Sequence, residues 1–263
     1  MNHAKPLIAL GLIAFCIPVQ AAQSARALLD KARERAISVP AFRRVDTTEQ
    51  SATAIVGQNR VPQTPQTNVV TIEVDLTKTL ARQTTTFGGQ QLIMLKQGEK
   101  AAMKMGDASW QVPAGVFANL AKDLGNLFVC EKETPETKEN APVWIVTGAE
   151  VLDGDEAIVI ETQGNTAVRL AQERMTEAIA KAFSGNPSAR PTVKVLEYSA
   201  KHWIRKSDSC RLLAIQESKR ITSVSIPGGT RKVIEQSSKA TSRYSYDHVT
   251  IEIPKAAQEI LSQ

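Results

Sequence analysis

The chain has 263 residues, of which 42% are hydrophobic and 22% are charged, and its formal net charge is +5. Lysines and arginines alternate with acids along the chain, without the basic block or the aromatic-basic interleaving of proteins that follow phosphates. This pattern argues against a nucleic-acid partner. The slight cationic excess is compatible with peripheral contact to an anionic membrane surface.

The first residues indicate export from the cytoplasm. Lys5 precedes an apolar run over residues 7–17, and Val19 and Ala21 have the spacing of small residues before a cleavage site. This run is shorter than the ~20 residues that a helix needs to cross a bilayer. We therefore predict a signal peptide over residues 1–21 and a secreted, periplasmic protein with a single domain over residues 22–263.

Cysteine usage fits an oxidising compartment. Cleavage would remove Cys16 and leave Cys130 and Cys210 as an even pair. We predict a disulfide between them, and a loop of this length gives a stabilisation of roughly 4 to 5 kcal/mol in the chain-entropy model. Two free, buried thiols are the alternative.

The first half of the chain predicts a helix followed by a β-meander. Apolar residues recur at helical spacing over residues 24–36, where Ser24 can cap the helix and Pro40 stops it. Residues 45–68 give weak strand signals and end in a Pro/Gln/Thr stretch that favours a turn. From residue 69 the apolar period changes to two, as in a half-buried antiparallel strand. Further strand candidates between glycine turns are residues 80–87, 90–97, 99–105 and 108–112.

The second half predicts two more helices and further strands. Helical spacing returns over residues 112–128, followed by a charged, proline-containing loop over residues 131–142. A tight hairpin at Asp153-Gly154-Asp155 joins two strands, and the longest predicted helix covers residues 166–183. The remaining strand candidates are residues 191–198, 201–206, 211–218, 222–226, 231–236, 241–246 and 249–253.

The sequence lacks the recognisable parts of a catalytic or metal site. His202 and His248 are the histidines that remain after cleavage, and neither stands near a cysteine or carboxylate at metal-ligand spacing. The serine-hydrolase elbow and the glycine-rich phosphate loops are absent. We therefore predict a protein that is not an enzyme and has no metal or other cofactor. An envelope hydrolase is the remaining enzymatic alternative.

The stretch YSAKHWIRKSDSC, residues 198–210, combines aromatic, cationic and hydroxyl side chains. In a strand, Tyr198 and His202 would lie on one face, whereas Lys201 and Trp203 would lie on the other. Strand alternation therefore separates the cluster, and a hairpin joined by disulfide at Cys210 is favoured over a catalytic site.

Three stretches carry a resemblance to a known family. They are GEKAAMKMGDASWQVP (residues 98–113), KHWIRKSDSCRLLAIQES (201–218) and SRYSYDHVTIEIPKAA (242–257). With the order of the predicted elements, they make the chain similar to the periplasmic lipoprotein-carrier superfamily, the LolA-like outer-membrane lipoprotein-sorting proteins. The resemblance implies an α+β fold with one curved antiparallel β-sheet, a half-open β-barrel, and about three helices packed on its concave side.

That fold implies an apolar cavity between sheet and helices that holds lipid or the acyl chains of a lipoprotein. Candidate lining residues are Phe117, Leu120 and Leu124 of the middle helix and Trp110 and Trp203 of the sheet. The alternative is an envelope protein-interaction or sensor module with a filled core. Such a module would contact another envelope protein through the sheet edge or the charged loop.

Overall fold

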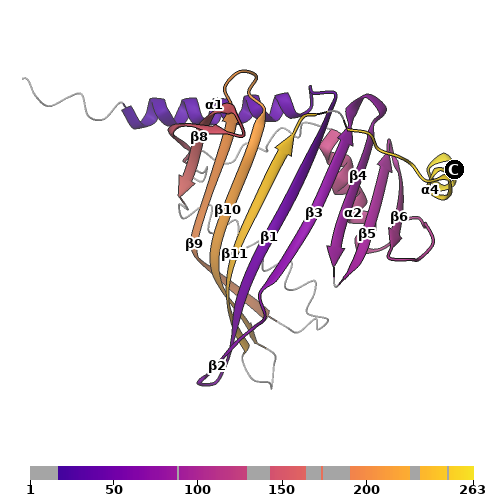
Figure 1. Ribbon diagram of the computed structural model, residues 1–263. Coiled ribbons are helices and arrows are strands. Elements are labelled where there is room, and N and C mark those ends of the chain that lie inside the picture. The colour runs from indigo at the N-terminus through magenta and orange to yellow at the C-terminus, as the bar shows by residue number, and fades with distance from the viewer. Residues whose placement is uncertain are drawn as a thin grey trace, which may run out of the picture.

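One antiparallel β-sheet dominates the computed structural model, which describes residues 17–87, 89–128, 143–163, 173, 190–225, 232–247 and 249–263 (Figure 1). The strands are β1 (Ala41–Val56), β2 (Asn59–Pro62), β3 (Gln66–Asp75), β4 (Leu80–Phe87), β5 (Gln90–Gln97), β6 (Lys100–Met105), β7 (Ile145–Leu152), β8 (Asp155–Gln163), β9 (Arg190–Arg205), β10 (Arg211–Ser225) and β11 (Lys232–Ser245). Their order is β6-β5-β4-β3-β1-β11-β10-β9-β8-β7, with β2 paired beside β1. The predicted single antiparallel sheet is confirmed.

The described helices lie at the two ends of the sheet. They are α1 (Ile17–Ala36), η1 (Leu76–Lys78), α2 (Val116–Gly125), η2 (Asn126–Phe128) and α4 (Lys255–Ser262). Helix α1 crosses the sheet near β7 and β9, α2 lies against β4 and β5, and α4 lies against β5 and β6 (Figure 1).

Helices α1 and α2 cover the same side of the sheet. Strand register places the side chains of Phe42, Val74 and Ile160 on this side, which we call the inner face. Leu29 of α1 packs against Ile160, and Leu124 of α2 packs in the same cluster as Val74. Among the described helices, α1 and α2 therefore both cover the inner face.

Helix α4 covers the opposite side, the outer face, which carries Leu95, Val159 and Trp203. Ala257 and Leu261 of α4 pack against Leu95. This helix was not predicted. A final strand over residues 249–253 was expected to be the last element of the chain. These residues instead form an extended segment with buried Val249 that leads to Pro254 at the start of α4.

The central strands are longer than their apolar pattern predicts. Strand β1 has 16 residues and was expected only as a weak signal, and β10 joins two predicted strands into one of 15 residues. Polar side chains on the inner face bond across strands at these positions. The Ser218 and Ser238 hydroxyls lie 2.9 Å apart, and Gln236 donates to Gln50 at 3.1 Å. Cross-strand hydrogen bonds therefore extend strands that sequence hydrophobicity would end.

Several other predicted elements were placed correctly, with local differences. Strands β3 to β6 and the helix α2 follow the predicted ranges, and Asp153-Gly154 has positive φ at both residues, as a two-residue hairpin requires. Residues 108–112 form only an isolated bridge between Met103 and Gln111. Ser24 lies inside α1 instead of capping it, because the helix already begins at Ile17.

Some predictions fall outside the described residues. They concern most of the predicted signal peptide, the charged loop over residues 131–142, the long helix over residues 166–183 except Glu173, Cys130 and His248. The predicted domain limits stay a prediction.

Candidate ligand-binding site on the inner face

A small cavity of 220 Å³ opens on the inner face between α1, the start of β1, η2 and the adjoining ends of β10 and β11. The described residues that line it are Ala32, Arg33, Ala36, Ile37, Phe42, Arg44, Asn126, Leu127, Arg211, Tyr244 and Tyr246. The lining combines an apolar wall with cationic and aromatic side chains.

Local sequence explains why space remains here. Ala32 and Ala36 stand four residues apart and therefore face the same side of α1, where their small side chains leave room below the helix. Across the cavity, Arg44 pairs in register with Tyr244, and Phe42 lies two residues earlier on the same face of β1. A helix with small residues thus crosses a sheet with aromatic ones without filling the gap.

The apolar side of the cavity continues into the main core. Phe42 is buried there together with Val74 and Leu124, and the half-buried Leu127 of η2 packs against them. Tyr246 also packs against this cluster. An apolar group that enters the cavity would therefore contact core side chains on this side.

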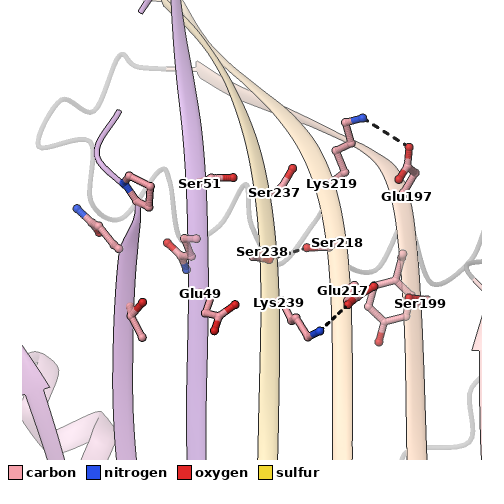
Figure 2. A pocket seen from close by; sticks show the side chains of 15 residues that line it. Glu49, Ser51, Glu197, Ser199, Glu217, Ser218, Lys219, Ser237, Ser238 and Lys239 are labelled. Carbon is pink, nitrogen blue, oxygen red and sulfur yellow. Dashed lines mark hydrogen bonds and ion pairs between the residues drawn. The ribbon is translucent and has the colours of Figure 1, made fainter. Parts of the chain in front are cut away.

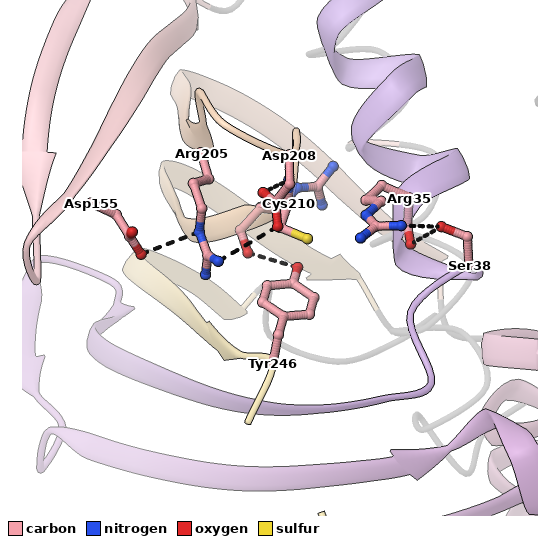
Figure 3. Close-up of polar contacts among 8 residues, drawn as sticks. Arg35, Ser38, Asp155, Arg205, Asp208, Cys210 and Tyr246 are labelled. Carbon is pink, nitrogen blue, oxygen red and sulfur yellow. Dashed lines mark hydrogen bonds and ion pairs between the residues drawn. The ribbon is translucent and has the colours of Figure 1, made fainter. Parts of the chain in front are cut away.

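A polar frame holds the neighbouring turn between β9 and β10 (Figure 3). Arg205 forms ion pairs with Asp155 at 3.2 Å and with Asp208 at 3.5 Å. The backbone N–H of Cys210 donates to Oδ1 of Asp208 at 3.0 Å. Positive φ at Ser209 turns the chain into β10. These bonds fix the start of β10, which carries Arg211 into the cavity.

Cys210 and His202, beside the cavity, have shifted pKa values that keep both side chains neutral at physiological pH. Burial, together with the nearby Asp208 carboxylate, raises the pKa of the Cys210 thiol to about 11. Burial, followed by the charges of Arg211 and Arg33, lowers the pKa of His202 to about 3. Neither an active thiolate nor a general base near neutral pH is present in this part of the site.

The structure separates the predicted lining residues. Phe117, Leu120 and Leu124 lie together on α2 in the inner-face core next to the cavity, although none of them lines it. Trp110 packs with the α4 cluster, and Trp203 is buried on the outer face, where its indole N–H donates to Glu150 at 2.8 Å. Their contact with a ligand stays a prediction.

The predicted disulfide also stays a prediction. Cys210 is a free, buried cysteine in the structure, and Cys130 lies outside the described residues.

Sequence reasoning missed the arginines and tyrosines of the cavity. Tyr244 and Tyr246 stand two residues apart and so share a strand face, which was a usable signal. These two tyrosines lie near Arg33, Arg44 and Arg211 only because β1 pairs with β11 and α1 docks on the sheet. No local spacing encodes either contact.

A second, larger hollow of 910 Å³ lies over the central strands β3, β1, β11, β10 and β9 (Figure 2). It is lined mainly by serines and charged side chains. Its charges compensate one another across strands: Lys239 pairs with Glu217 at 3.3 Å, and Lys219 pairs with Glu197 at 3.7 Å. Both lysines that line this hollow are therefore paired with carboxylates, and it offers an anionic ligand no unpaired lysine among the described residues that line it.

Metal sites and membrane-spanning helices are two further features to consider in the described part of the chain. In that part of the chain, no group of three or more His, Cys, Asp or Glu side chains is arranged to hold a metal ion. None of the helices described there has both the length and the apolar character to span a membrane.

Comparisons with known proteins give similarity in structure only. No family model matches the chain, and no curated protein matches it in sequence. Lipoprotein LppX of Mycobacterium tuberculosis is 10% identical over 88% of this chain and 99% of its own, with a TM-score of 0.44. LprF of Mycobacterium bovis is 9% identical over 89% of this chain and 98% of its own, with a TM-score of 0.46.

A putative outer membrane lipoprotein-sorting protein domain from Vibrio parahaemolyticus is 10% identical over 92% of this chain and 100% of its own, with a TM-score of 0.26. At these TM-scores the similarities do not locate functional residues in this chain.

Proposed function

We propose that this protein binds the apolar part of a lipid, or the acyl chains of a lipoprotein, between the inner face of the sheet and helices α1 and α2. The cavity beneath Ala32 and Ala36 carries the proposal, because its apolar wall continues into the core through Phe42 and Leu127. In this proposal the protein is a carrier and not an enzyme.

Binding would be driven by removal of acyl surface from water, which contributes ~25 cal/mol per Å². The cavity of 220 Å³ is smaller than the roughly 300 to 1,000 Å³ of pockets that enclose whole ligands. A complete acyl chain therefore requires a helix to move outward. Helix α1 is suited to this movement, because over residues 24–36, where the burial of its side chains is described, two of the three buried side chains are the alanines Ala25 and Ala32, which bury little surface.

The compartment is part of the same proposal. A signal peptide over residues 1–21 would direct a mature protein, residues 22–263, to the periplasm, where acyl chains need a carrier through water. Helix α1 includes residues 17–21, so cleavage there would shorten its N-terminal end and leave the cavity-lining turn intact. Peripheral contact with the membrane surface would accompany loading and release.

Native mass spectrometry of the mature protein from its own envelope tests this function first. A lipid-sized mass that is lost on mild organic extraction is expected. Dye uptake then tests the site: the Ala36→Phe variant, which fills the cavity, should lose uptake of Nile red and its displacement by lipid. Ala27→Phe on the exposed side of the same helix is the matched control. Equal uptake by both variants would rule out this cavity.

One observation supports the alternative, an envelope interaction module. Strand β7 ends the strand order, and it and the preceding residues carry exposed apolar side chains, with Val143 at 57% and Val151 at 72% exposure. An edge strand can pair with an extended segment of a partner. A protein that refuses added lipid and dye in both assays would favour this module over the carrier.

A further inference from the structure

Three arginines from three separate elements meet at the inner-face cavity. Arg33 comes from α1, Arg44 from β1 and Arg211 from the first position of β10. No acidic residue is found among the described residues that line the cavity. The polar side of an otherwise apolar cavity is therefore cationic.

The nearby acids compensate only part of this charge. Arg44 pairs with Asp46 at 2.9 Å. Arg33 pairs with Asp30 at 3.2 Å, but the same carboxylate also pairs with Arg26 at 3.5 Å and is half exposed to solvent. Arg44 and Arg33 thus each have an acidic partner, which leaves Arg211 to be considered.

Arg211 has no ion pair with any described residue. Its Nε is buried without a hydrogen-bond partner, and its guanidinium carbon lies 5.8 Å from the ring centre of Tyr244. Stacking on a ring holds the guanidinium flat and leaves its donors directed sideways. A buried donor without an acceptor is costly, and an anionic group would supply the missing acceptor.

The electrostatic field beside the cavity agrees with this arrangement. His202 lies on the same face, and after burial itself the positive charges of Arg211 and Arg33 are the causes that lower its pKa. The positive charges of Arg211 and Arg33 therefore act on the inner face beside the cavity. An anion in the cavity would experience the same field as an attraction.

We propose that the cavity recognises an anionic amphiphile, in which one carboxylate or phosphate group binds between Arg211, Arg33 and Arg44 while the attached chain lies along Ala36, Phe42 and Leu127. This inference rests on the proposed function and specifies its ligand class. Arginine suits the role, because its planar fork matches the oxygens of both anions.

Binding of matched amphiphiles with the same alkyl chain tests the inference. The probes are laurate, dodecyl phosphate and the neutral dodecanol, each measured by displacement of Nile red from the full-length mature protein. Laurate and dodecyl phosphate are expected to bind about tenfold more tightly than dodecanol, as one to two charge-assisted hydrogen bonds imply. Inorganic phosphate alone should not compete at the same concentrations.

Two arginine variants assign the preference to the site. Arg211→Gln should bring the anionic probes to the affinity of dodecanol and leave dodecanol unchanged. Arg243→Gln is the matched control, since Arg243 lies in the same sheet, is 56% exposed and pairs with Asp153 away from the cavity. Arg33→Gln, on a different element, repeats the test if the Arg211 variant folds poorly.

The outcomes separate this inference from the proposed function. Equal binding of laurate and dodecanol, or an unchanged preference in Arg211→Gln and Arg33→Gln, overturns the anionic class while the carrier function stands. If inorganic phosphate competes as strongly as dodecyl phosphate, the alkyl chain contributes nothing to binding, and the inference that the ligand is an amphiphile is overturned. Failure of all three probes overturns both proposals.

Discussion

The hydroxyl of Tyr246 donates a hydrogen bond to the backbone carbonyl of Arg211 at 2.8 Å. This bond joins the residue after β11 to the first residue of β10, 35 positions earlier in the chain. Tyr246 is half-buried, so the bond is partly shielded from water, and burial raises the pKa of the phenol. It fixes the backbone from which the Arg211 side chain enters the cavity.

Removal of this hydroxyl should therefore destabilise the protein. Tyr246→Phe leaves the carbonyl of Arg211 without its partner, and we expect the free energy of unfolding to fall by roughly 1 to 3 kcal/mol. Urea denaturation followed by tryptophan fluorescence measures the change. Tyr244→Phe, two residues earlier, is the control, and it should change stability by less because its ring still supports Arg211. Equal losses in both variants would contradict the assignment.

His202 predicts a pH dependence of stability. Its pKa falls from 6.5 to about 3 on folding, because the ring is buried and faces the charges of Arg211 and Arg33. Between these values the unfolded chain binds a proton that the folded protein does not bind, so stability decreases as the pH falls below about 6.5. From pH 7 to pH 5 this group alone costs roughly 2 kcal/mol.

His202→Gln should remove that part of the pH dependence. The difference in free energy of unfolding between pH 7 and pH 5 is measured by urea denaturation for the variant and for the unchanged protein. The variant should lose less stability on acidification, whatever its stability at pH 7. Parallel pH profiles would show that the histidine titrates normally in the fold.

Asp75 at the end of β3 caps the following turn η1. Its carboxylate accepts bonds from the backbone N–H of Thr77 at 3.1 Å and of Lys78 at 3.2 Å, and from the Thr77 hydroxyl at 2.6 Å. Asp75→Ala should cost about 1 to 2 kcal/mol, as for other lost caps. Thr77→Ala removes only the hydroxyl bond and should cost less in the same denaturation assay. The opposite order would contradict the capping role.

The disulfide between Cys130 and Cys210 is a separate prediction. Alkylation of the denatured, unreduced protein from an oxidising compartment should label neither cysteine, and prior reduction should expose both, as read by intact mass. Protein made in a reducing cytoplasm is the control. Two labelled thiols in the exported protein would establish the free pair instead, with the Cys210 thiol kept unreactive in the fold by its raised pKa.

The sequence predicted best where one element carries its own signal. The alternation in β3 and the turn at Asp153-Gly154 both gave correct local structure. Strand β1 was underestimated because its polar residues find their partners in β11, nearly 200 positions away. The cavity was missed for the same reason. Phe117, Leu120 and Leu124 were chosen by periodicity and their contact with a ligand stays a prediction, whereas the cavity forms where α1 lies over β1 and β11.

The two ends of the sheet differ in how many of their faces the described helices cover. Strands β4 to β6 lie between α2 on one side and α4 on the other, so their amides are covered from both directions. The described helix at the other end, α1, covers β7 to β9 on the inner side alone. Hydrogen exchange should therefore be slowest in β5 and fastest in β7, a gradient of local opening along the sheet. Ligand entry would then use the quickly exchanging end, while the doubly covered strands keep the fold together.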